Sequence, residues 1–268
     1  MMLNYKSFFA FTRDPFGQDI RVDELHKTPA LDDSADRFLY AVNLRAACVL
    51  TGEVGAGKST ALRYASSKLH PSAFKLIFLV ANPGAPLEFL RLMASALDLD
   101  SKSNSSTRLL KTIRASLMEI SLLKQTPVLV IDEANLLRLE TLALLHTIAQ
   151  FDMDSKPVMP IVLAGQNNLI DRLSFHSSRP LASRVVGRTH LDGLNLNEMS
   201  DYLKHHLKIA GVHDGLFSEE AVLAIHQNSG GLLRRANALA RGALVAAANE
   251  KLRVVGAEHV RIASTEII

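Results

Sequence analysis

One stretch of the chain has the residue types and spacing of a phosphate-binding loop. The residues Gly52-Glu-Val-Gly-Ala-Gly-Lys-Ser59 fit the pattern Gly-x-x-x-x-Gly-Lys-Ser/Thr. Glycines let the backbone turn tightly and direct its N–H groups at a phosphate, and the dipole of a following helix adds positive potential there. The motif predicts ATP and Mg²⁺ as cofactors, with Lys58 on the β- and γ-phosphates, Ser59 on the metal and Thr60 capping the loop. The predicted nucleotide-binding residues are Gly52, Glu53, Val54, Gly55, Ala56, Gly57, Lys58, Ser59 and Thr60.

Polar side chains end two further apolar runs. Val128-Leu-Val-Ile is followed by Asp132 and Glu133, and Ile161-Val-Leu-Ala-Gly is followed by Gln166. Downstream of a phosphate-binding loop, Asp132 is expected to bind Mg²⁺ directly or through water, and Glu133 to polarise the attacking water. If the two runs are neighbouring strands, Gln166 can hydrogen-bond that water or the γ-phosphate, and a plain strand-ending turn is the alternative. The adjacent glutamate favours hydrolysis of ATP over binding alone.

Apolar runs alternate with helical patterns over the first two thirds of the chain. The runs at 46–51, 76–81, 128–131 and 159–164 are nearly continuous, as in parallel strands covered on both faces. Helical patterns at 58–69, 86–97, 106–123 and 136–150 separate them, which predicts an α/β fold with right-handed crossovers. After Leu191 only amphipathic helices follow, at 196–210, 218–228, 232–250 and 257–263, with Asn195 and Ser218 as N-caps. We therefore predict a sheet domain over 1–194, including an N-terminal segment 1–40, and a helical domain over 195–268.

Composition restricts the function classes without selecting one. With 268 residues, 48% hydrophobic and 21% charged, the chain can form one large domain or a large and a small one. No apolar run reaches the roughly 18 residues of a membrane span and no secretory signal is evident, so we expect a cytoplasmic protein without membrane partners. The single cysteine, Cys48, is interpreted as a buried hydrophobe, and the ten histidines, His205 and His206 included, as solvated or capping residues rather than zinc ligands. A net charge of +3 permits a polyanionic partner but does not require one.

Several short segments resemble the ExeA family of the AAA+ ATPase superfamily, over about residues 5–250. They are Phe8-Phe9-Ala-Phe-Thr-Arg-Asp-Pro15-Phe16, Leu163-Ala-Gly-Gln166, Leu181-Ala-Ser-Arg184-Val and Ser229-Gly-Gly-Leu-Leu-Arg234-Arg-Ala-Asn237. The resemblance implies a three-layer P-loop AAA+ domain with a small all-helical lid. It also implies that Gln166 is the sensor-1 residue, Arg234 the sensor-2 residue and Arg184 the arginine finger, with Arg179 and Arg188 as competitors for the finger. Relatives commonly have Gly-Leu-Pro-Arg where this chain has Gly-Leu-Leu-Arg. Pro15 and Phe16 are expected near the adenine or, equally, as a hydrophobic anchor.

The resemblance implies two different roles for the ATPase. Secretion-associated ExeA proteins continue into a membrane span and a peptidoglycan-binding domain, whereas this chain ends at Ile268, so we expect a stand-alone ATPase module. Such modules resemble the MuB, TnsC and TniB regulators of transposition, which bind double-stranded DNA independently of sequence, oligomerise as rings or filaments, and direct a transposase to its target. The alternatives are an ExeA-like assembly ATPase acting on protein partners in secretion or envelope biogenesis, and a nucleotide switch that scarcely hydrolyses ATP. Candidate DNA contacts, or merely solvated charges, are Lys102, Arg108, Lys111, Arg114, Lys204, Lys208, Arg234, Arg235 and Arg241.

Overall fold

Two separate hydrophobic cores divide the chain into two units. The structure is a computed structural model that describes residues 5–212 and 215–266. A sheet unit comprises residues 29–52 and 58–191, and a helical unit comprises the described residues of 1–28, 53–57 and 192–268. Among the described residues, no helix combines the length and apolar character needed to cross a membrane.

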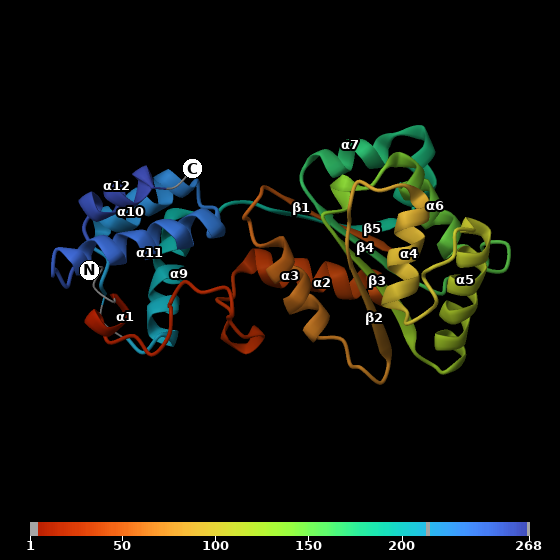
Figure 1. The fold of residues 1–268 in the computed structure, drawn as a ribbon, viewed down its shortest axis with the longest axis horizontal. Coiled ribbons are helices and arrows are strands. Elements are labelled where there is room, and N and C mark those ends of the chain that lie inside the picture. Colours follow the sequence, from red (N-terminus) through yellow and green to blue (C-terminus); the bar gives the residue numbers. More distant parts are fainter. Residues whose placement is uncertain (1–4, 213–214, 267–268) are drawn as a thin grey trace. The chain divides into compact units, whose positions relative to one another are not determined.

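The sheet unit is built on five parallel strands in the order β2-β3-β4-β1-β5 (Figure 1). The predicted parallel α/β sheet is therefore confirmed, and all four predicted runs form strands. The run at 76–81 was wrongly expected to be buried on both faces, because β2 is an edge strand that pairs only with β3 and leaves Leu76, Phe78 and Val80 exposed. β1, β3 and β4 are buried along almost their whole length, which explains their unbroken apolar sequences. The bounds are Ala47–Gly52 for β1, Phe74–Val80 for β2, Thr126–Asp132 for β3, Ile161–Gly165 for β4 and Val185–Leu191 for β5.

The edge strand β5 was not predicted. Its sequence Val-Val-Gly-Arg-Thr-His-Leu alternates between exposed and buried positions from Val186 onward, because the strand pairs only with β1. Such alternation is typical of a half-buried strand. A search for continuous apolar runs misses it.

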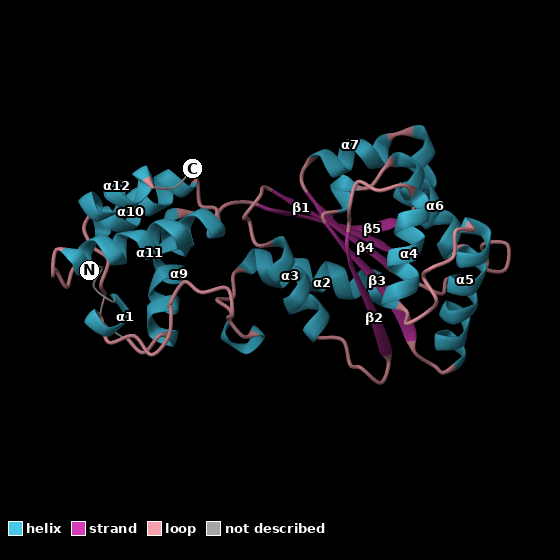
Figure 2. Ribbon diagram, viewed as in Figure 1, coloured by secondary structure: helices cyan, strands magenta, loops and turns pink. Residues whose placement is uncertain are grey.

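Helices cover both faces of the sheet and make three layers (Figure 2). α4, α5 and α6 share an apolar cluster with alternate residues of β1 to β4, such as Val49, Leu129 and Leu163. α2 and α3 pack together and contact β1, while α2 also contacts β5 and α3 also contacts β4. The predicted helix 136–150 divides into a 3₁₀ turn and α6. The bounds are Pro29–Asn43 for α2, Lys58–Ser67 for α3, Pro86–Ala96 for α4, Ser106–Leu122 for α5, Ala134–Leu136 for η2, Leu139–Ala149 for α6, Asn168–Ser174 for α7, His176–Ser178 for η3 and Arg179–Ala182 for α8.

The helical unit contains the four helices expected near the C-terminus. α9 has a capping box, in which the Asn195 side chain accepts from the Glu198 N–H at 3.0 Å, and the Ser218 hydroxyl accepts from the Ala221 N–H at the start of α10. These two predicted caps are confirmed. The bounds are Leu196–Ile209 for α9, Glu219–Ser229 for α10, Leu233–Asn249 for α11 and Ala257–Thr265 for α12; α1 spans Tyr5–Phe8 and η1 spans Val22–Glu24.

The N-terminal segment 5–28 packs with these helices rather than with the sheet unit to which the sequence interpretation assigned it. Phe9, Phe11 and Phe16 are buried in the same apolar cluster as α9 and α11. Phe16 is 1% exposed and stacks on His206 of α9, with ring centroids 5.6 Å apart. Burial of three phenylalanines outweighs the sequence proximity of this segment to β1. Within the helical unit, Phe16 is therefore a hydrophobic anchor.

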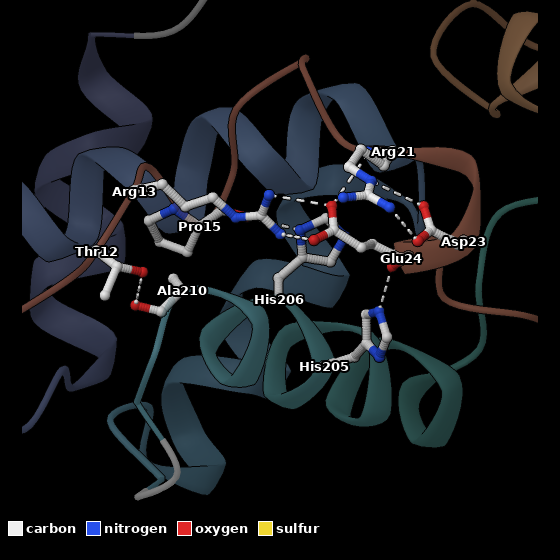
Figure 3. Close-up of polar contacts among 9 residues, drawn as sticks. All are labelled: Thr12, Arg13, Pro15, Arg21, Asp23, Glu24, His205, His206 and Ala210. Atoms are coloured by element: carbon white, nitrogen blue, oxygen red, sulfur yellow. Dashed lines mark hydrogen bonds and ion pairs between the residues drawn. The ribbon is translucent and has the colours of Figure 1, made fainter.

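Polar contacts hold the same segment on α9 (Figure 3). His206 Nδ1 donates to the Pro15 carbonyl at 2.6 Å, and His205 Nε2 donates to the Glu24 carbonyl at 2.6 Å. The Thr12 hydroxyl donates to the Ala210 carbonyl at 3.0 Å. His206 is only 4% exposed, so its interpretation as a solvated or capping histidine was wrong: the packed N-terminal segment excludes water from its ring.

Candidate nucleotide-binding site

The phosphate-binding motif lies between a buried strand and a helix. β1 ends at Gly52 and α3 begins at Lys58, so residues 53–57 form the loop that the motif requires. Gly55 and Gly57 have φ angles of +89° and +98°, a region that residues with a Cβ rarely adopt. The two glycines are therefore needed for the shape of the loop.

The motif lysine and serine already have partners near the strand ends of the sheet unit. Lys58 is 6% exposed and its Nζ donates to the Gly52 carbonyl at 3.0 Å. The Ser59 hydroxyl donates to Asp132 Oδ2 at 2.6 Å, which joins the start of α3 to the end of β3. Thr60 lies in the first turn of α3. The structure thus brings Ser59 and Asp132 together.

The donors at this point suit a magnesium ion. A hydroxyl and a carboxylate are hard oxygen ligands, and Mg²⁺ is usually held by one or two such groups together with substrate phosphates and water. Among the described residues, no group of three or more His, Cys, Asp or Glu side chains is arranged to hold a metal. Binding of Mg²⁺ would therefore depend on Ser59 and Asp132 together with the phosphates of a nucleotide, as the motif predicts.

Glu133 has a strained backbone. Its φ and ψ angles of 53° and 32° are left-handed, and its N–H donates to Asp132 Oδ1 at 2.9 Å. A non-glycine residue in this region costs of order 1 kcal/mol or more, and such outliers cluster at functional sites. The geometry turns the chain sharply after Asp132, so that one carboxylate ends β3 and the other directly follows it.

Asn135 is a residue that sequence reasoning missed. β3 and β4 are neighbours, as the interpretation of Gln166 required, with Ile131 opposite Leu163. The buried Asn135 side chain accepts from the Gln166 N–H at 3.0 Å, and a Cβ on Gly165 would lie 2.7 Å from the same amide oxygen. Asn135 therefore positions the backbone of Gln166. The signal available in the sequence was an asparagine two residues after the carboxylate pair.

Within the helical unit, the first turn of α11 contacts the loop. The Arg234 N–H donates to the Gly55 carbonyl at 3.2 Å, and a Cβ on Gly55 would lie 2.9 Å from Arg234 Cβ. Gly55 is therefore restricted both by its φ angle and by this close approach. The Arg234 residue is exposed, and its backbone and Cβ lie beside the loop, while its sensor-2 role stays a prediction.

The three finger candidates differ in their surroundings. The Arg184 guanidinium pairs with Asp154 and donates to His146 Nδ1 at 3.2 Å. The guanidinium lowers the pKa of Asp154. Arg179 and Arg188 are exposed, and their side chains make no hydrogen bond or ion pair within the described part of the chain.

Comparison with known proteins places this geometry in a known fold. The family model described as the AAA domain matches residues 42–173. This part of the chain is therefore similar to an AAA domain. This segment includes the motif 52–59, the pair Asp132 and Glu133, and Gln166. The match supports an ATPase of the AAA type.

Other known proteins are similar to a larger part of the chain. The general secretion pathway protein A of Aeromonas hydrophila is 27% identical over 245 residues, which is 91% of this chain, and the chain spans only 45% of that relative's length. The CDC6P structure from Pyrobaculum aerophilum has a TM-score of 0.75 at 16% identity, covering 96% of this chain and 72% of the other. The Aeropyrum pernix ORC1 protein in complex with DNA has a TM-score of 0.71 at 19% identity, covering 96% and 70%. At these identities the two structures show a shared fold: a P-loop AAA fold followed by a helical region.

Proposed function

We propose that the chain is a Mg²⁺-dependent ATP hydrolase. The hydrogen bond of 2.6 Å between Ser59 and Asp132, beside the motif lysine, is the observation on which the proposal depends. It places the predicted metal ligands together at the carboxyl end of a strand, where open α/β sheets bind their ligands. The AAA domain match supports the same reading.

Each residue has a defined task in this reaction. The loop N–H groups and Lys58 neutralise the phosphate oxygens, on which charge is spread in the transition state. Ser59 and Asp132 would hold Mg²⁺, which would neutralise further negative charge on the phosphates. Glu133 accepts a hydrogen bond from the attacking water and orients it, and Gln166 contacts that water or the γ-phosphate.

Two substitutions test nucleotide binding and hydrolysis separately. Lys58→Ala removes the cation that contacts the phosphates and is expected to abolish ATP binding. Glu133→Gln keeps the shape of the side chain, so ATP still binds while kcat falls by roughly 10²-fold to 10⁴-fold, as for loss of a general base. Lys75→Ala, an exposed lysine on β2, is the control and leaves both quantities unchanged. If Lys58→Ala binds ATP as well as the unaltered chain does, the proposal is refuted. If Glu133→Gln hydrolyses ATP at an unchanged rate, Glu133 has no role in hydrolysis and the chain is better described as a nucleotide switch.

We further propose that the ATPase binds double-stranded DNA independently of sequence, oligomerises on it, and regulates transposition or target-site selection with a transposase as partner. The net charge of +3 and the exposed cations Lys102, Lys111, Lys204 and Lys208 support a polyanionic partner. This role places the protein in the cytoplasm. The test is ATP turnover with and without duplex DNA, together with electron microscopy of the products. Absence of any ATP-dependent retention of DNA would eliminate this role.

The arginine finger makes hydrolysis dependent on assembly in this proposal. Arg184, or its competitors Arg179 and Arg188, would reach the site of a neighbouring subunit and stabilise the transition state there. A head-to-tail contact of this kind generates a ring or a helical filament. ATP turnover per subunit should then rise with protein concentration, whereas a concentration-independent turnover would contradict a finger acting between subunits.

The secretion relative favours a second candidate function. Because the aligned Aeromonas hydrophila protein belongs to a secretion pathway, an assembly ATPase acting on protein partners is the alternative. In that case ATP turnover does not respond to DNA and the assembled form is not retained on it. The same measurement therefore separates the two functions.

A further inference from the structure

A basic pocket of about 430 Å³ lies in the helical unit, beside α9. It contains none of the residues predicted to bind the nucleotide. Two lysines and two histidines contribute to its lining, against a single carboxylate. The lining residues are His26, Asp201, Lys204, His205, Lys208, Val212 and Gly215.

The two lysine ammonium groups are not directly paired with another side chain in the described part of the chain. Lys204 and Lys208 are one turn apart on α9, so their side chains share one face, and both are exposed. Neither ammonium group forms a hydrogen bond or an ion pair with a described residue, Asp201 included. Like charges at this spacing destabilise a helix slightly. An anion between them would remove that cost.

The two imidazoles stand beside these cations. His205 is held in place because its Nε2 donates to the Glu24 carbonyl, as Figure 3 shows. The His26 ring lies 5.2 Å from the His205 ring, centroid to centroid, and its nitrogens make no hydrogen bond with a described residue. Burial and the neighbouring His205 lower the pKa of His26, while Asp201 and Glu198 oppose this. A bound anion would raise the pKa of His26 and accept a hydrogen bond from an N–H of its ring.

We propose that this pocket binds a phosphate group, held by Lys204, Lys208 and a ring N–H of His26. Lysine ammonium groups bind phosphate as point charges, and a protonated or neutral imidazole adds a directed donor. The inference rests on the proposed DNA-binding function, in which the phosphate belongs to the DNA backbone. Such a contact positions the duplex without reading its sequence, which agrees with sequence-independent binding.

The pocket is tested first with inorganic phosphate. The ring signals of His26 and His205 are followed by NMR in the full chain and assigned with His26→Gln and His205→Gln. Added phosphate should shift the His26 signal saturably and raise the pKa of His26, and the double variant Lys204→Ala/Lys208→Ala should abolish both effects. No shift, or an equal shift in the double variant, would overturn the proposal.

The source of the phosphate is tested with DNA. The ATP-loaded chain is assayed for retention of duplex DNA at several salt concentrations. In Lys204→Ala/Lys208→Ala, loss of one phosphate contact should reduce the magnitude of the slope of log K against log salt by about 0.9, where K is the DNA association constant. It should also lower the DNA affinity at about 0.1 M salt by roughly tenfold. The control Lys75→Ala/Lys156→Ala makes the same change in net charge at exposed lysines of the sheet unit. Turnover of ATP without DNA stays unchanged in both double variants.

The two arms give distinguishable outcomes. A response to inorganic phosphate together with a selective loss of DNA affinity in Lys204→Ala/Lys208→Ala supports the proposal in full. A response to inorganic phosphate with DNA affinity equal to that of the control overturns the DNA backbone as its source. If the unaltered chain does not retain DNA at all, the proposed function fails, and the inorganic phosphate arm still decides whether the pocket binds an anion.

Discussion

Acidification should destabilise the chain through His206. Its ring is 4% exposed, stacks on Phe16 and lies 4.2 Å from the Tyr202 ring, centroid to centroid. Burial lowers the pKa of His206 to about 4 from an ordinary 6.5, and the charges of His205, His26 and Arg13 act in the same direction, opposed by the hydrogen bond to Pro15. The buried ring is therefore neutral at pH values where the unfolded chain binds a proton.

The sign and size of the effect follow from proton linkage. Above about pH 6.5 neither state binds the proton, and the full stability is present. As the pH falls from 6.5 to about 4, only the unfolded state becomes protonated, so the free energy of unfolding decreases. A difference of this size in pKa corresponds to about 3 kcal/mol, at about 1.4 kcal/mol per unit.

A variant isolates this contribution. His206→Phe keeps a ring in the core but leaves the Pro15 carbonyl without its donor, which costs about 1–3 kcal/mol at neutral pH. Its stability no longer contains the titration, so unaltered and variant chains should converge, and can exchange order, as the pH falls to about 4. Urea unfolding followed by circular dichroism across this range measures both curves. His176→Gln, at an exposed histidine, is the control and should run parallel to the unaltered chain. If the difference between the unaltered chain and His206→Phe stays constant across the range, the reasoning is refuted.

Three further substitutions test the candidate site. Asn135→Ala should lower kcat for ATP by roughly tenfold with little change in nucleotide affinity, because a lost hydrogen bond is worth about 1.4 kcal/mol or less; an unchanged kcat would show that the amide positions nothing that reacts. Gly55→Ala should weaken nucleotide binding measured by calorimetry, because φ is +89° and the new methyl would lie 2.9 Å from Arg234 Cβ; unaltered affinity would contradict this. Arg184→Ala should reduce turnover of the assembled form by about 10³-fold, whereas Asp154→Ala, which removes the ion pair but leaves the hydrogen bond to His146, should not; equal losses would mean that Arg184 has only a structural role.

The nucleotide motif could be predicted because its chemistry is local. The glycines, Lys58 and Ser59 occupy one short loop, and their spacing alone requires a strand before them and a helix after them. Asp132 followed the same logic, since an apolar run that ends in carboxylates downstream of a phosphate-binding loop is expected to be a buried strand that ends at the nucleotide site. The central strands β1, β3 and β4 were predictable for a related reason, because strands buried on both faces have unbroken apolar sequences. The edge strand β2 was recognised by the same criterion only because its exposed residues are apolar too.

Elements that are apolar on one side only were harder to recognise. β5 is exposed at alternate positions and includes Arg188 and His190, so it resembles a polar connection when examined for continuous hydrophobicity. α2 spans Pro29–Asn43 and includes the buried residues Ala35 and Phe38, within a segment that was assigned no element of its own. The available signals were the period-two alternation of β5 and the helical periodicity of α2. Each is visible only over a longer stretch of sequence than the short apolar runs that identify buried strands.

Roles that depend on partners far away in the sequence leave no local pattern at all. His205 and His206 are adjacent on α9, yet their acceptors, the Glu24 and Pro15 carbonyls, lie 181 and 191 positions earlier in the chain. Without the N-terminal segment packed on α9, both residues are polar side chains on a surface helix, which is what the sequence predicted. With that segment in place, one imidazole becomes part of a core and the other lines a basic pocket. The same two residues therefore acquire a pH-dependent contribution to stability and a place in the lining of the pocket from long-range packing, and neither property can be inferred from the sequence of α9 alone.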